Sequence, residues 1–178
     1  MDYLKILREN PGLAEEFDSL FDFFLLDELS PRDDAEGRCT FSLPGMAFAR
    51  DGSGGEYHLL EDGSIGYYSS EGEAGRLAES MDDLFSLLVS CICWHDCCDA
   101  KQYVDSKTLE EYGQRQRNTN LEDMDSLRRV SDALGIPTGE PLAPVLERFR
   151  KATQREPVYQ CIFHEDDGSL TESYGLMF

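Results

Sequence analysis

A short segment rich in cysteine is the part of the chain best suited to chemistry. Its sulfur and imidazole groups belong to Cys91, Cys93, His95, Cys97 and Cys98. If the helix predicted before this segment continued through it, Cys91, His95 and Cys98 would stand at i, i+4 and i+7 and share one face. Such a set could bind zinc, with Cys39 or Cys161 as a fourth ligand. A thiol of Cys91 or Cys98 beside His95 could instead act as a nucleophile.

Buried packing is the competing interpretation of the same residues. The segment contains no paired Cys-x-x-Cys knuckle, and Cys93 and Cys97 would point away from the helical stripe. Free cysteine is among the most buried residue types and packs as a small apolar side chain. We therefore favour packing, predict no metal and no cofactor, and expect all six cysteines to be free thiols in a reducing compartment.

Other catalytic motifs are incomplete. His58 lies in the middle of a predicted strand, and His164-Glu165 begins a zinc-protease pattern but has Gly168 where the second histidine belongs. Gly52-Ser53-Gly54 lacks the spacing of a nucleophile elbow, and no glycine-rich phosphate-binding loop joins a strand to a helix. The sequence therefore predicts a protein that is not an enzyme.

The charge of the chain is strongly negative and unevenly distributed. The 178 residues include 36 acidic and 16 basic side chains, so the formal net charge is −20. Residues 1–36 carry 11 acids and 3 bases, residues 51–83 carry 9 and 1, and residues 156–178 carry 5 and none, whereas residues 101–155 carry 9 acids and 10 bases. This balance disfavours nucleic acid and predicts that a partner recruited by charge is basic.

Membrane insertion and export are also disfavoured. The longest mostly apolar run, residues 84–94, is too short to span a bilayer, and it contains two serines. The first ten residues lack the apolar region of a signal peptide, which predicts a cytoplasmic location.

The first half of the chain predicts helices followed by strands. Residues 2–9 and 13–29 have helical patterns, and residues 30–34 resemble a loop. Residues 46–68 predict a three-stranded antiparallel meander, because glycine-rich and Asp62-Gly63 turns separate three apolar runs. We expect a type I′ turn at Asp62-Gly63.

The second half predicts mainly helices. Residues 69–79 are interpreted as a polar loop or a short helical turn, and Ser80 as the cap of a helix that carries Met81, Leu84, Phe85, Leu88 and Ile92 on one face. Three more helices follow at about 107–117, 121–134 and 141–154. Alternating residues on either side of Asp167-Gly168 predict a C-terminal β-hairpin.

One region resembles a known family. The run GMAFARDGSGGEYHLLEDGSIGYYSSEGEAGRLAESMDDLFSLL contains Phe48, the Gly54-Gly55 pair, Tyr57, an Asp-Gly turn and a Glu-containing loop before a Leu/Phe-rich helix. In this order and spacing, the run resembles the SUKH superfamily over about residues 44–90. That superfamily includes a fungal cell-wall-synthesis regulator and bacterial immunity proteins of polymorphic toxin systems. The resemblance implies an α+β domain whose antiparallel or mixed sheet is flanked by helices, and a role in binding proteins.

Together these features predict one organisation and one leading function. We expect a SUKH-like domain over residues 1–100 and a helical extension over residues 101–178, which ends in a hairpin and packs on the same domain. The leading function is neutralisation of a cognate toxin, for example a basic nuclease, by protein binding. The alternatives are a regulatory scaffold like the fungal member and a zinc- or thiol-dependent enzyme.

Seven residues are the predicted partner contacts. They combine carboxylates, which would steer a basic partner, with aromatic side chains, which often anchor interfaces. These residues are Asp51, Glu56, Tyr57, Tyr68, Glu71, Glu73 and Glu79. Tyr67 and Trp94 are further candidate anchors, and packing in the core or against the sheet is the competing role for each aromatic.

Overall fold

The computed structural model describes residues 1–32 and 37–177 and has an α+β fold. The predicted loop at 30–34 falls partly outside these residues. The helices are α1 (Tyr3–Glu9), α2 (Pro11–Phe21), α3 (Met81–Cys91), α4 (Ser106–Asn120), α5 (Met124–Leu134) and α6 (Leu142–Thr153), with short 3₁₀ turns η1 (His95–Cys97) and η2 (Ala100–Gln102). The strands are β1 (Phe24–Ser30), β2 (Cys39–Phe41), β3 (Gly45–Arg50), β4 (Glu56–Leu60), β5 (Ile65–Tyr68), β6 (Ala74–Ala78), β7 (Cys161–His164) and β8 (Leu170–Glu172).

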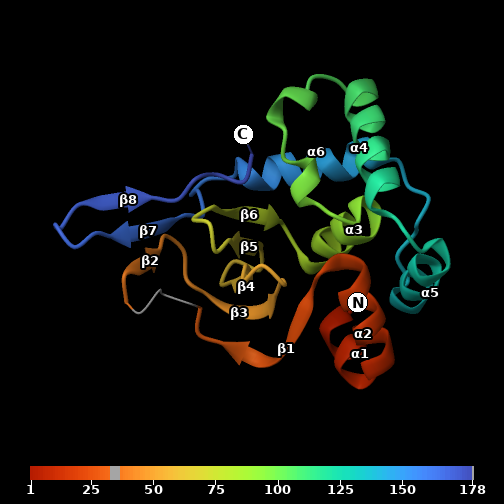
Figure 1. Ribbon diagram of the computed structural model, residues 1–178, viewed down its shortest axis with the longest axis horizontal. Helices are drawn as coiled ribbons and strands as arrows, with labels where there is room; N and C mark the ends of the chain where they lie inside the picture. Colours follow the sequence, from red (N-terminus) through yellow and green to blue (C-terminus); the bar gives the residue numbers. More distant parts are fainter. Residues whose placement is uncertain (33–36, 178) are drawn as a thin grey trace.

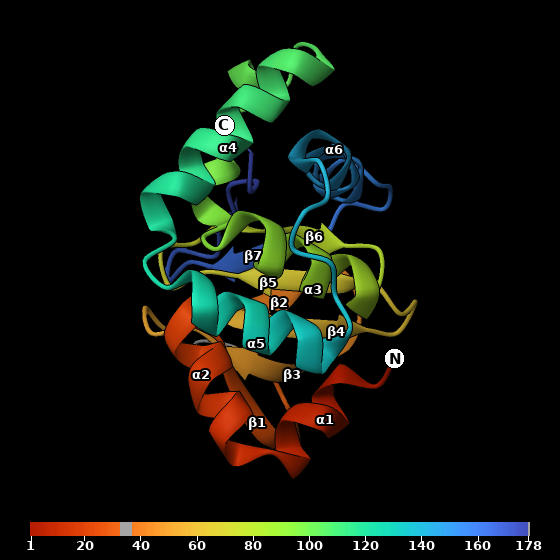
Figure 2. The ribbon, with the colours of Figure 1, turned by 90° about the vertical axis from the view of Figure 1, so that its right-hand side faces the viewer.

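The described strands form two antiparallel sheets. The larger sheet has the order β1-β3-β4-β5-β6, and the smaller has the order β2-β7-β8. In Figure 1 the smaller sheet extends to the left, away from most helices. Figure 2 shows α1 and α2 beside β1, and α6 beside β6. The smaller sheet pairs residues 39–41 with residues 161–163, so it joins segments far apart in the sequence.

The first face of the larger sheet carries the main aromatic core. Phe23 from the α2–β1 junction packs against Tyr57 of β4 and Phe48 of β3. Phe17 of α2 and Phe85 of α3 pack around the same ring. Burying these large rings is the main favourable contribution to holding the two helices on the sheet.

The second face is also covered, by the rings of Phe41 and Tyr159, and it carries several buried polar side chains. Tyr159 packs so closely on β5 that a Cβ atom at Gly66 would lie 2.6 Å from its ring. His58 hydrogen-bonds to Tyr159 Oη through Nδ1 (2.6 Å) and to Glu56 Oε2 through Nε2 (3.1 Å). Arg50 donates to the other oxygen of Glu56. Because both faces are covered, β4, β5 and β6 are buried almost throughout.

A buried arginine joins this face to the C-terminal segment. The Arg76 guanidinium donates to Ser64 Oγ, to the carboxylate of Asp62, and to the backbone oxygens of Arg155 and Pro157. Burial raises the pKa of Asp62, but hydrogen bonds from Ser64 and Arg76 outweigh this effect and bring it down to about 2. The chain between α6 and β7 is therefore tied to the edge of the larger sheet.

Several predicted elements are confirmed. Residues 46–68 form the antiparallel meander β3-β4-β5, and Ser80 caps α3 by accepting a hydrogen bond from the backbone N–H of Asp83. The helix predicted at residues 2–9 corresponds to α1, and the three later helices correspond to α4, α5 and α6. The C-terminal hairpin is β7-β8.

Two predicted elements are wrong. The helix predicted over residues 13–29 ends at Phe21, because Asp22 adopts a left-handed conformation (φ 50°) and residues 24–30 pair with β3. Residues 74–78 were predicted as a loop or a helical turn, but they form β6. The strand pairs with β5, and its one charged side chain, Arg76, finds buried hydrogen-bond partners.

The predicted turn type at Asp62-Gly63 is also wrong. Among the described residues of this turn, Gly63 has positive φ (83°) and Asp62 does not. The backbone N–H of Gly63 donates to Leu60 O, and that of Leu60 donates to Ser64 O. This geometry is a type I turn followed by a glycine bulge.

Candidate functional site

A chain of hydrogen bonds connects the end of β3 to the segment after α3. The carboxylate of Asp51 accepts a 2.5 Å hydrogen bond from the hydroxyl of Tyr67, and His95 Nε2 lies 3.1 Å from the same hydroxyl. The His95 ring stacks on the indole of Trp94, with ring centroids 3.7 Å apart. Trp94 in turn donates through Nε1 to the hydroxyl of Tyr57 (3.1 Å). The chain thus links three aromatic rings and a carboxylate to one exposed histidine.

The glycine-rich turn after β3 fixes the position of Asp51. Its Oδ1 accepts hydrogen bonds from the backbone N–H groups of Ser53 and Gly55 and from the Ser53 hydroxyl. A Cβ atom at Gly55 would lie 2.1 Å from the Tyr67 hydroxyl, so only glycine fits at this close approach. Burial raises the pKa of Asp51, but hydrogen bonds from Tyr67, Ser53 and Gly55 outweigh it and hold the pKa low. Asp51 is therefore an ionised carboxylate, which can accept hydrogen bonds but cannot donate one.

The hydrogen-bond partners define the tautomer of His95. Tyr67 has a single hydroxyl proton and gives it to Asp51, so Nε2 of His95 must donate to Tyr67. Nδ1 is then the nitrogen with the free lone pair. Burial of the packed side of the ring lowers the pKa of His95, while the negative charges of Asp51, Glu73, Asp96 and Asp22 raise it, and the net shift is downward. His95 is therefore neutral at pH 7.

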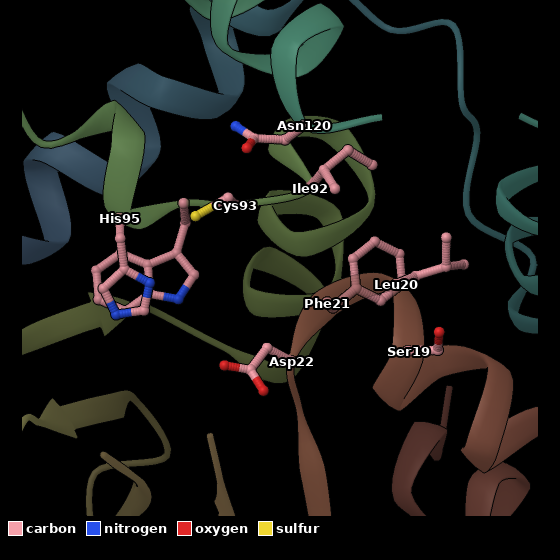
Figure 3. A pocket seen from close by; sticks show the side chains of 9 residues that line it. Ser19, Leu20, Phe21, Asp22, Ile92, Cys93, His95 and Asn120 are labelled. Atoms are coloured by element: carbon pink, nitrogen blue, oxygen red, sulfur yellow. The ribbon is translucent and has the colours of Figure 1, made fainter. Parts of the chain in front are cut away.

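His95 and Trp94 line a hollow of about 200 Å³ (Figure 3). Its walls come from the end of α2, the segment after α3 and the end of α4. The lining residues are Ser19, Leu20, Phe21, Asp22, Ile92, Cys93, Trp94, His95 and Asn120. A second hollow, of about 270 Å³, shares Ser19, Leu20 and Asn120 with the first and adds Glu16, Glu122, Asp123 and Ser126. We call the two hollows together the α2–α4 groove.

The α2–α4 groove is rich in hydrogen-bond acceptors. Asp22 uses Oδ1 to accept from the backbone N–H of Gly52. Asn120 donates both amide protons, to Asp96 Oδ2 (2.8 Å) and to Gln116 O (3.0 Å), which leaves its Oδ1 as an acceptor. Within the described part of the chain, no lysine or arginine lines either hollow.

Four of the seven predicted contact residues are buried. Asp51, Glu56, Tyr57 and Tyr68 expose 6%, 2%, 1% and 8% of their surface. Asp51 and Tyr57 support the hydrogen-bonded chain beneath His95, and Glu56 belongs to the polar cluster on the second face of the sheet. Asp51 and Tyr57 are therefore positioned to hold the candidate site from below, whereas Glu56 and Tyr68 lie on the other face of the sheet.

The three remaining predicted contacts lie nearer the surface. Glu71 is exposed and Glu73 is half-buried, and both lie in the turn between β5 and β6. That turn contacts the β3–β4 turn, because the hydroxyl of Ser70 donates to Ser53 O. Glu79 is exposed and pairs with Arg155 (2.5 Å). The structure therefore brings Glu71 and Glu73 to the end of the sheet where His95 lies, and ties Glu79 to the C-terminal segment.

The predicted helical stripe of Cys91, His95 and Cys98 does not form. Helix α3 ends at Cys91, because Ile92 turns to positive φ (67°) and His95 lies in the 3₁₀ turn η1. Cys91 and Cys98 are buried, and burial raises the pKa of Cys98 far above its usual value. In residues 1–32 and 37–177, no group of three or more histidine, cysteine or carboxylate side chains could hold a metal ion.

All six cysteines carry free thiols, and Cys93 is the one that lines the α2–α4 groove. Burial raises the pKa of its thiol, although a hydrogen bond from the backbone of Asp96 opposes this rise. A thiol with a raised pKa is a weak nucleophile at neutral pH, because the thiolate is the reactive form.

Asp22 and Asn120 line the groove but were not predicted as site residues. Asp22 lay inside a predicted helix, and Asn120 lay at the edge of another. Both reach the groove only because the end of α2 and the end of α4 lie beside the segment after α3. Neither Phe23 nor the many acidic residues nearby distinguish Asp22 as a site residue in the sequence.

Comparison of the chain with protein-family models, with curated proteins and with solved structures found no match. The resemblance to the SUKH superfamily therefore stays a prediction. Among the described helices, none is both long and apolar enough to cross a membrane.

Proposed function

We propose that this chain is a non-catalytic binding protein that recognises a basic protein partner. The observation that carries this proposal is the α2–α4 groove, whose polar side chains are mainly acceptors and carboxylates and whose floor contains buried apolar and aromatic side chains. A hydrophobic floor supplies affinity, and acidic walls select a positively charged partner.

The charge of the whole chain supports the same proposal. A net charge of −20 attracts basic surfaces over several ångströms and accelerates their encounter. A toxin that acts on nucleic acid needs a basic active site, so an acidic protein can cover that site by competing for the same charges. With the SUKH resemblance, this favours a cytoplasmic immunity protein that blocks a co-encoded toxin.

The test uses the product of the neighbouring gene as the partner. We expect the purified full chain to form a stoichiometric complex with it, and the association rate constant to fall at least tenfold between 0.02 M and 0.3 M NaCl, measured by stopped-flow or surface plasmon resonance. Changing Glu71 and Glu73 together to lysine should slow association further. Two results would contradict the proposal. One is an association rate constant that does not change with ionic strength, and the other is catalytic activity of the isolated chain.

A further inference from the structure

We propose that the α2–α4 groove receives a segment of the partner protein, and that one arginine side chain of this segment enters the hollow between Asp22, His95 and Asn120. The inference rests on the proposed function and specifies its binding site. It names the surface and the chemistry of the group that fills it, neither of which follows from net charge alone.

The size of the hollow favours a single side chain. Its volume of about 200 Å³ lies below the ~300–1,000 Å³ of typical small-molecule sites. The adjoining hollow continues past Ser19, Leu20 and Asn120, so backbone on either side of an inserted side chain has a path along the surface. A protein segment therefore suits this groove better than a cofactor or metabolite.

The hydrogen-bonding groups of the hollow favour a donor. Asn120 already donates both amide protons to other groups of the chain, so only its Oδ1, an acceptor, is available to a ligand. His95 gives its Nε2 proton to Tyr67, which leaves Nδ1 as an acceptor. Asp22 adds a carboxylate with one oxygen already used by Gly52. A ligand that supplies several N–H donors satisfies these groups together.

Arginine matches this set better than lysine does. Its guanidinium offers five N–H donors in a fixed plane, whereas an ammonium group is a compact point charge. The acceptors come from three separate elements, the end of α2, the segment after α3 and the end of α4, so a fork of donors can reach more than one of them. The exposed imidazole of His95, backed by the indole of Trp94, adds a flat surface on which a guanidinium can stack.

The surrounding charge reinforces this choice. His95 is neutral and lies among the carboxylates of Asp22, Asp51, Glu73 and Asp96, so the field at the hollow is negative. Glu16, which lines the second hollow, is already paired with Arg129. The charge of Glu16 is therefore already compensated, and the negative field at the hollow comes from the other carboxylates.

The experiment titrates the ¹⁵N-labelled full chain with short peptides and follows amide chemical shifts. The probes are acetyl-Gly-Arg-Gly-amide, the lysine and citrulline versions, and free spermidine. We expect saturable shifts from the arginine peptide at Asp22, Cys93, His95 and Asn120 and at the indole N–H of Trp94. The citrulline peptide, which has the same shape without the charge, should cause none.

A matched pair of variants tests the role of Asp22. Asp22→Asn should weaken binding of the arginine peptide at least fivefold, and asparagine keeps both the left-handed backbone and the acceptor for Gly52. Asp166→Asn removes the same charge from the distant β7–β8 turn and should leave binding unchanged. Equal binding of the citrulline or lysine peptide, saturation by spermidine alone, or an unaffected Asp22→Asn variant would overturn the assignment.

The same variants separate this inference from the proposed function. If the partner protein binds wild type and Asp22→Asn equally well, the groove assignment fails and the proposed function stands. If the arginine peptide binds in the groove but the partner protein does not bind at all, the proposed function fails on its own.

Discussion

The buried histidine of the larger sheet has a protonation state that its neighbours determine. Glu56 can only accept, so Nε2 of His58 carries the proton and Nδ1 accepts from the hydroxyl of Tyr159. Protonation of His58 at Nδ1 would remove the acceptor for the Tyr159 hydroxyl and would place a positively charged ring in a buried site. Burial lowers the pKa of His58 more than Glu56 raises it, so the neutral form belongs to the folded chain.

This residue predicts a loss of stability in mild acid. The pKa of His58 is lower in the folded chain than its unfolded value near 6.5, so the unfolded chain binds more protons below that pH. The free energy of unfolding should therefore fall as the pH drops from 7.5 to 5.5. Urea unfolding at both pH values measures it.

Two variants show which histidine is responsible. His58→Gln should be less stable at pH 7.5 and should show a smaller fall between pH 7.5 and 5.5. His164→Gln, at an exposed position in β7, should keep the wild-type fall. A His58→Gln variant with the full wild-type pH dependence would move the effect to other groups, such as His95, whose pKa is lowered too.

At the scale of elements, α3 connects the core to the candidate site. It packs against α6, α4 and β6, and the segment that follows it carries Trp94 and His95. Its N-terminus is capped by Ser80, whose hydroxyl oxygen accepts from the backbone N–H of Asp83 (3.1 Å). The cap at the start of α3 therefore helps to fix the helix whose C-terminal end leads into the site.

Removal of the cap gives a prediction for this element. Ser80→Ala should lower the free energy of unfolding by about 0.5–2 kcal/mol, because one backbone N–H of the first turn loses its partner. Ser80→Asn should restore most of the loss, since asparagine is an equally good cap and its amide can still donate to the Asp83 carboxylate. Ser106→Ala, at the exposed first position of α4, is the control and should change stability by less than about 0.5 kcal/mol. Equal effects at positions 80 and 106 would contradict the capping role.

Elements with strong local signals were predicted correctly. The meander of β3, β4 and β5 is marked by turns, and α3 is marked by its cap and apolar stripe. Elements that depend on partners far away in the sequence were predicted wrongly. Phe24 and Leu25 fit a helical spacing, but pairing with Ala49 and Arg50 draws them into a strand. Strand β6 contains a buried arginine whose partners lie up to 81 residues away.

The candidate site could be predicted only in part for the same reason. The sequence drew attention to Asp51, Tyr67, Trp94 and His95 one by one, but not to the hydrogen bonds that connect them. It assigned His95 to a helical stripe with Cys91, and the end of α3 separates the two. The α2–α4 groove exists only because the ends of α2 and α4, which are far apart in the sequence, lie beside the segment after α3.

For the whole molecule, the net charge of −20 predicts a dependence of stability on salt. Carboxylates repel one another in the compact state, and salt screens this repulsion by shortening the Debye length from ~30 Å at 0.01 M to ~8 Å at 0.15 M. Most ion pairs involve at least one partly exposed side chain, and such pairs contribute little to stability. The urea midpoint should therefore rise with NaCl over this range.

The control is a variant in which Glu71, Glu165 and Asp166 are replaced by the corresponding amides. Its urea midpoint should rise less with NaCl, because there is less repulsion to screen. A urea midpoint that falls with added salt would mean that attractive pairs outweigh repulsion in this fold.

The pairing of β2 with β7 also constrains the order in which the protein can be completed on the ribosome. Phe41 of β2 cannot pair until its partner Cys161 of β7 has been made, 120 positions later. At ~5–20 residues per second, roughly 6 to 24 s pass between the synthesis of these two strands. During that interval the nascent chain presents an unpaired strand edge, so it is most open to misassembly or chaperone capture before residues 161–163 are made.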